Sequence, residues 1–167
     1  IVNVEADRVE HLEGRRITTL PATAAAGRVT ITATDHLVQE GARRFAVARG
    51  PAAIEVSSHQ PVDISRETNG DVALVLTVRR DSALTGPVSL SMRGGGRSGS
   101  VDAAALAALP QGRWVRLGVP LKCFAARGVA MDKVDQPLLL ALTGPGTVSL
   151  ASARLGTETD QLLACPK

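Results

Sequence analysis

Aromatic residues are almost absent from this 167-residue chain, which has one tryptophan, two phenylalanines and no tyrosine. Proteins that bind single-stranded nucleic acid usually stack the bases on aromatic side chains beside a basic groove. The formal net charge is only +3, and the arginines are interleaved with acidic residues instead of forming a stripe. The composition therefore argues against a nucleic-acid partner and favours a solvated surface of mixed charge.

Long apolar runs are absent as well. No stretch approaches the roughly 18 residues that a membrane-spanning helix needs, and no signal peptide is recognisable, so no membrane partner is predicted. The chain begins at Ile1 and not at a methionine, which favours a piece of a larger protein.

Cysteine is scarce, and the two copies are Cys123 and Cys165. Two cysteines are too few for a disulfide scaffold, and nothing near them completes a zinc site. If the parent protein is exported, a Cys123–Cys165 disulfide would hold the C-terminal tail. If the parent is cytosolic, both are expected as buried thiols, and the sequence leaves both alternatives open.

Catalytic patterns are missing too. His11, His36 and His59 stand singly, without a partner at metal-ligand spacing, and no serine has the context of a nucleophile. The acidic residues mostly fall at predicted turns, where local hydrogen bonding favours them. We therefore predict no catalytic residues and no cofactor. A structural calcium held by turn carboxylates and carbonyls is the one metal that the sequence leaves open.

Three glycines have the spacing of a nucleotide-binding motif. Gly94, Gly96 and Gly99 match the G-x-G-x-x-G spacing of a dinucleotide-binding loop, between a predicted strand and a predicted helical stretch at 101–109. The next strand ends in Pro-Leu-Lys at 120–122, without the acid that would bind a ribose hydroxyl, and no further alternating helices follow. The segment is therefore predicted to be a flexible loop.

The fold class follows from short β-branched runs separated by Gly, Pro, Asn and Asp. The clearest strand is 71–80, in which alternate apolar residues point to one face. Other strands are expected at 28–33, 44–47, 53–57, 88–92, 113–121, 137–143 and 147–155, the last two as a hairpin across 144–146. We predict an all-β sandwich of antiparallel sheets with at most one short helix. Residues 1–27 are predicted to be a linker or edge segment, and 28–167 the sandwich domain.

The segment 112–124, GRWVRLGVPLKCF, is the most distinctive in the chain. It alternates as a strand up to Pro120 and then bends. Trp114 and Phe124 are its large side chains, and core packing is the expected role of both.

Several motifs along the chain are together similar to a known family. They are DHLVQEGAR at 35–43, VDISRE at 62–67 leading into NGDVAL at 69–74, VSLSM at 88–92, the G-x-W-x-x-L-x-V-P-L-K-C-F pattern at 112–124, and Pro-Leu at 137–138. In this order, over roughly residues 28–155, they resemble the C-terminal galactose-binding-like domain of bacterial glycoside hydrolase family 3 enzymes of the exo-β-glucanase and β-glucosidase type.

The resemblance implies a galactose-binding-like jelly roll that is a non-catalytic accessory domain. The parent would be periplasmic or secreted and would hydrolyse β-glucosidic bonds of glucans or cello-oligosaccharides in separate catalytic domains. This domain would pack on them and frame the active-site entrance. Gln39, Glu40 and Arg43, from the most polar motif, are the candidates for that contact. The alternative is an independent carbohydrate-binding module that binds β-glucan or oligosaccharide. Such modules usually expose several aromatic platforms, so the single tryptophan favours the accessory role.

Overall fold

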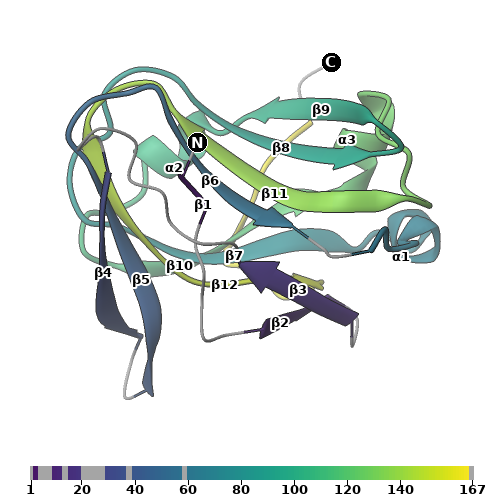
Figure 1. Cartoon of the computed structure of the whole chain (residues 1–167), viewed down its shortest axis with the longest axis horizontal. Coiled ribbons are helices and arrows are strands. Elements are labelled where there is room, and N and C mark those ends of the chain that lie inside the picture. The colour runs from purple at the N-terminus through teal and green to yellow at the C-terminus, as the bar shows by residue number, and fades with distance from the viewer. Residues whose placement is uncertain are drawn as a thin grey trace.

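Two β-sheets packed face to face form the body of the molecule in the computed structural model (Figure 1). The structure describes residues 2–3, 9–12, 15–19, 29–36, 39–57 and 60–165. For the first three of these ranges, for 31, 33 and 36, and for 39–41 and 57 it describes the backbone alone. No helix in this described part is long and apolar enough to cross a membrane. The predicted β-sandwich is confirmed.

One sheet has seven strands. In the order β2-β3-β6-β11-β8-β9, with β1 beside β6, they are Val9–Leu12, Arg15–Thr19, Ala52–Ser57, Val134–Leu142, Val88–Gly94, Arg97–Asp102 and, for β1, Val2–Asn3. Every pair is antiparallel except β1 with β6. The three strands within residues 1–27 therefore add to this sheet. The division of the chain at residue 27 stays a prediction.

The other sheet has six strands. In the order β13-β10-β7-β12-β5-β4 they are Gln161–Leu162, Trp114–Pro120, Ala73–Arg80, Gly146–Gly156, Gln39–Val47 and Val29–His36. The pairs are antiparallel except β13 with β10. A β-bulge in β12 between Leu150 and Ser152 shifts its register against β7 by one residue.

The core lies between the sheets and is built by alternation. In β7, Leu74, Leu76 and Val78 are completely buried, as the sequence predicts for one face of this strand. Leu90 and Met92 of β8 are equally buried in the opposite sheet. The residues between them in sequence belong to the opposite faces of the two sheets, where Thr77 is partly exposed but Val75 and Ser91 are also buried.

Three short helices accompany the sheets in the described part of the chain, so the expectation of at most one is wrong. They are α1, Ser65–Asn69; α2, Ala104–Ala107; and α3, Leu121–Ala126. Only α2 falls in the stretch predicted as helical. At α1 the Asp63 carboxylate accepts a hydrogen bond from the Ser65 backbone N–H at 3.0 Å. Helices of four to six residues are too short to show a helical period in the sequence.

Two predicted connections are also wrong. The segments 137–143 and 147–155 do not form a hairpin, because β11 and β12 belong to different sheets. The glycine-rich segment at 93–100 is not a flexible loop but the tight turn of the β8–β9 hairpin. Gly95 and Gly96 have φ values of 61° and 74°, which a two-residue hairpin turn requires and glycine tolerates.

Candidate functional site

The three polar residues singled out from the sequence all lie in β5. Gln39 is opposite His36 and Glu40 is opposite Asp35 in the register with β4, while the side chains of Gln39 and Glu40 lie outside the described part of the chain. Arg43 is half-buried and has Leu150 of β12 opposite it. Their common strand brings the three residues together along β5.

The part of β5 that holds Gln39 and Glu40 extends past the neighbouring strand β12, and Arg43 lies where the pairing with β12 begins. β12 pairs with β5 only over residues 43–47, whereas β4 pairs with β5 along its whole length. Figure 1 shows the β4–β5 hairpin reaching beyond the rest of the six-stranded sheet. Its distal end is therefore a two-stranded projection.

The register of the six-stranded sheet creates a second arrangement, which sequence reasoning missed. Trp114 of β10 is opposite Arg79 of β7, Arg79 is opposite Ser149 of β12, Ser149 is opposite Arg44 of β5, and Arg44 is opposite Thr32 of β4. This row crosses five strands. It lies on the face away from the core, because Arg79 alternates with the buried Val78.

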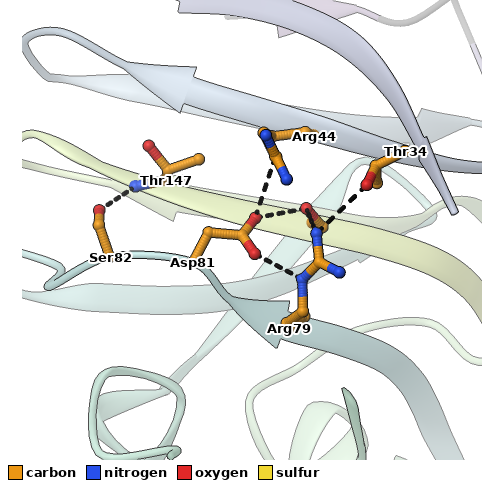
Figure 2. Close-up of polar contacts among 7 residues, drawn as sticks. Thr34, Arg44, Arg79, Asp81, Ser82 and Thr147 are labelled. Carbon is orange, nitrogen blue, oxygen red and sulfur yellow. Dashed lines mark hydrogen bonds and ion pairs between the residues drawn. The ribbon is translucent and has the colours of Figure 1, made fainter. Parts of the chain in front are cut away.

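Asp81, just after β7, gathers the middle of this row into a polar cluster (Figure 2). Its Oδ1 accepts a hydrogen bond from Arg79 Nε at 2.5 Å, and its Oδ2 accepts one from the Ser149 hydroxyl at 2.5 Å. Arg44 Nε lies 3.6 Å from the same Oδ2. Arg79 Nη2 donates to Thr34 Oγ1 at 3.2 Å. We call these five residues the Asp81 cluster.

The Asp81 cluster is partly shielded from solvent. The side chains of Arg79 and Asp81 are 15% and 14% exposed, and Ser149 is fully buried, whereas the Arg44 side chain is 45% exposed. Because charged groups so far removed from water are costly unless paired, Asp81 stabilises both guanidinium groups in place. One feature of the sequence pointed to this cluster: in the predicted strand 71–80, Arg79 alternates with the apolar residues and so belongs to the outer face.

Trp114 does not lie in the core, where the sequence analysis expected it. It is the first residue of β10, it is half-buried, and it is on the outer face, with the Arg79 guanidinium carbon 4.8 Å from its ring centroid. At this distance the cation and the ring attract each other, which holds the plane of the guanidinium. Trp114 is outside the core because alternate residues of a strand face opposite sides, and the buried side of β10 is formed by Val115, Leu117 and Val119.

Phe124 and the cysteines lie at one end of the sandwich. Phe124 is completely buried in α3, and the neighbouring Cys123 is 2% exposed. A disulfide joins Cys123 to Cys165, with 5.3 Å between their Cα atoms. The bond attaches the tail that follows β12 to α3.

The tail is also held to β10 by charge. Arg116 Nη2 lies 3.0 Å from Asp160 Oδ1, and the Arg116 backbone N–H donates to Asp160 Oδ2 at 2.8 Å. These hydrogen bonds lower the pKa of the Asp160 carboxyl below its ordinary 3.8. A lowered pKa stabilises the attached tail above pH 3.8, and this contribution is lost as the pH falls through the pKa of the folded state.

Metal ligands do not gather in the described residues, where no three His, Cys, Asp or Glu side chains lie together. Two of the turn carboxylates considered for calcium have other partners. Asp63 accepts the hydrogen bond from the Ser65 backbone N–H at the start of α1, and Asp135 forms an ion pair with Arg93, with 3.2 Å between Nε and Oδ1. A structural calcium stays an untested expectation.

Comparison with known proteins identifies a family for the chain and solved structures with a similar fold. A family model described as galactose-binding domain-like matches residues 9–155. No curated protein matches the sequence. Among solved structures, the exo-1,3/1,4-β-glucanase of a Pseudoalteromonas species is similar over 95% of this chain, with a TM-score of 0.68 and 18% identity. The chain spans one fifth of the length of that enzyme.

Two further solved structures are similar. The extra C-terminal domain of the same glucanase, solved as a separate chain, matches with a TM-score of 0.65 and 18% identity over 95% of this chain and 90% of that domain. An exo-β-agarase matches with a TM-score of 0.56 and 13% identity over 96% of this chain and 25% of its own. At these identities the structural matches establish the fold.

Proposed function

Because the chain belongs to the galactose-binding domain-like family, we propose that it is a non-catalytic accessory domain of a larger enzyme that hydrolyses β-glucosidic bonds. The observation that carries this proposal is the match over almost the whole of the extra C-terminal domain of an exo-1,3/1,4-β-glucanase. The sequence motifs support a parent of glycoside hydrolase family 3 acting on glucans or cello-oligosaccharides. Catalysis would belong to other domains of the parent.

The ion pairs of the chain support a role without catalysis. Most glycosidases need two carboxyl groups across the scissile bond, and one of them commonly has a raised pKa so that it can donate a proton. Here Asp71, Asp81, Asp135 and Asp160 each lie against a lysine or arginine. For Asp160, the hydrogen bonds from Arg116 lower the pKa of the carboxyl, which is the opposite of what a general acid requires.

The isolated chain is expected to show no turnover of aryl-β-glucosides or cello-oligosaccharides. The isolated chain is a suitable sample because the corresponding glucanase domain has been solved as a separate chain. Release of aryl alcohol or glucose is measured against buffer and against heat-denatured protein. Turnover that survives repurification would contradict the proposal. Calorimetric binding of cello-oligosaccharide without turnover would instead favour an independent carbohydrate-binding module.

The projecting end of the β4–β5 hairpin is the part we assign to the contact with the catalytic domains. It holds Gln39 and Glu40, and Arg43 lies at its base, where the pairing with β12 begins. Among the described residues, the part of β5 before Arg43 has no pairing with β12, which leaves this edge for a neighbour. A two-stranded projection of this kind can reach the mouth of an active site on an adjoining domain. We propose that it frames that entrance.

Reversing both charges in the variant Glu40→Lys with Arg43→Glu tests this contact. In the full-length parent we expect KM for long oligosaccharides to rise several-fold. The melting temperature of the isolated chain should stay nearly unchanged, because ion pairs at a protein surface usually contribute under about 1 kcal/mol to stability. Kinetics on long and short substrates are compared. Wild-type kinetics on both lengths would remove these residues from the contact and leave the accessory role standing.

The disulfide supports an exported parent. Disulfides persist in the periplasm and outside the cell and are rare in the cytosol, where thiols are kept reduced. The Cys123–Cys165 bond therefore fits a periplasmic or secreted enzyme, which is also the compartment where polymeric glucans are encountered.

A further inference from the structure

The Asp81 cluster leaves several of its strongest hydrogen-bond donors without a partner. Among the residues that the structure describes, Arg79 uses Nε and Nη2, and Arg44 uses Nε alone. Arg79 Nη1 and both terminal nitrogens of Arg44 make no hydrogen bond or ion pair there. Figure 2 shows the two side chains converging on Asp81, with one terminal nitrogen of Arg79 turned away from Thr34.

The charges of the cluster do not balance either. Two guanidinium groups and one carboxylate leave one net positive charge on the outer face of the six-stranded sheet. Arg79 and Asp81 are mostly removed from water, where an additional anion interacts more strongly than it would in bulk solvent. A guanidinium whose Nε is already bound still presents a planar edge that matches a carboxylate.

Arg79 is also held in position before any ligand arrives. Arg79 is fixed by Asp81 on one edge, by Thr34 and Ser149 at Nη2, and by the Trp114 ring against its plane. Such pre-organisation lowers the side-chain entropy that binding would otherwise cost. A cluster that served only to join β7, β12, β5 and β4 would not need unpaired guanidinium N–H groups on the outer face of the sheet.

We propose that the Asp81 cluster is a seat for an aspartate or glutamate side chain of an adjoining domain of the parent, and that the row from Trp114 to Thr32 is the docking face. This inference rests on the accessory role proposed above. A neutral glucan offers no charge to match the excess positive charge, whereas a protein carboxylate does. Arginine and tryptophan are also the residue types most enriched at energetic centres of protein interfaces. Thr34 connects this face to the projecting β4–β5 hairpin.

The test compares amide hydrogen exchange in the intact parent and in the isolated chain. Peptides covering 42–47 and 147–152 are expected to exchange more slowly in the intact parent. Arg44→Gln in the parent is expected to lower this protection about tenfold, because one charge-assisted hydrogen bond is lost. Arg93→Gln is the matched control: its side chain is 40% exposed and paired with a single carboxylate, but on the seven-stranded sheet. It is expected to leave the protection unchanged.

The outcomes separate this inference from the proposed function. Equal exchange of these peptides in both samples, with protection elsewhere on the chain, would overturn the docking face and leave the accessory role intact. Turnover by the isolated chain would contradict the accessory role itself. The other possible occupant is an acidic sugar, and sodium glucuronate is the probe for it. Our assignment is wrong if glucuronate binds the isolated chain, if Arg44→Gln abolishes this binding, and if the intact parent shows no protection. Arg44→Lys, which keeps the charge without the planar fork, should retain part of the protection if the variant Arg44→Gln proves unstable.

Discussion

Replacing Phe124 with alanine is expected to lower the free energy of unfolding by about 3–5 kcal/mol, because a large aromatic side chain with no exposed surface leaves a cavity. The site has little freedom to collapse. A Cβ added at Gly99 of β9 would lie 3.3 Å from the Phe124 carbonyl oxygen and 2.9 Å from Val129 Cγ2, so α3 and the segment after it already pack tightly on this strand. Urea denaturation of the isolated chain measures the loss as a shift of the midpoint.

Trp114→Ala is the matched control for this prediction. Since Trp114 is half-buried and its ring contacts a guanidinium on the outer face, its loss is expected to cost under about 2 kcal/mol. Phe124→Leu should retain most of the stability and guards against a variant that does not fold. If the tryptophan variant proved the less stable of the two, the placement of Trp114 outside the core would be contradicted.

The contrast between these two aromatics shows how far periodicity can be used. In β7 the alternation of Leu74, Leu76 and Val78 fixes which face is buried, and the structure agrees. The segment 112–124 alternates in the same way, but its buried positions are Val115 and Leu117. Trp114 lies in the opposite phase, and its prediction as a core residue, which rested on its size and apolarity, was wrong. Size and apolarity alone do not place a residue in the core, because the outer face of a sheet also accepts an aromatic that a cation covers.

The Asp81 cluster could not be predicted for a different reason. Arg79 is 45 residues from Thr34 and 70 from Ser149, and only the register of four strands brings them together. Neither the strand order nor the bulge in β12 is encoded in any local pattern. The predicted hairpin between β11 and β12 was wrong for the same reason, since a short glycine-containing connection is compatible with both a hairpin and a change of sheet.

Strand β9 was missed because its residues lack the usual strand composition. Its sequence, RSGSVD, contains only one β-branched apolar residue, and it follows three glycines. Pairing along the whole of β8 compensates for this weak local preference, from Ser89 opposite Asp102 to Gly94 opposite Arg97. Tertiary context therefore determined this strand, as it commonly does for β-structure.

Removing the disulfide by Cys165→Ser is expected to lower the free energy of unfolding by up to about 4 kcal/mol, because the bond closes a loop with a sequence separation of 42 and restricts the unfolded chain. Cys165 is the residue to change, since it is exposed and leaves no cavity, whereas Cys123 is 2% exposed. Urea denaturation of oxidised wild type, reduced wild type and the variant measures the effect.

The folded tail should remain in place when the bond is lost. The Leu163 backbone N–H donates to the Gly118 carbonyl at 2.8 Å, the Leu163 side chain is 7% exposed, and Arg116 binds Asp160. Gly118 permits this close approach, because a Cβ there would meet Thr159 Cγ2 at 2.4 Å. These contacts belong to the folded state and are unaffected by the substitution, so the expected loss comes from the greater freedom of the unfolded chain.

The reduced wild type is the control that isolates the bond from the substitution. Reduced wild type and Cys165→Ser are expected to unfold at the same urea concentration, and oxidised wild type at a higher one. Cys123→Ser should be less stable than either, because a hydroxyl then replaces a buried sulfur in the core. If oxidised and reduced wild type unfolded identically, the bond would contribute no stability, and the support that it gives to an exported parent would be withdrawn.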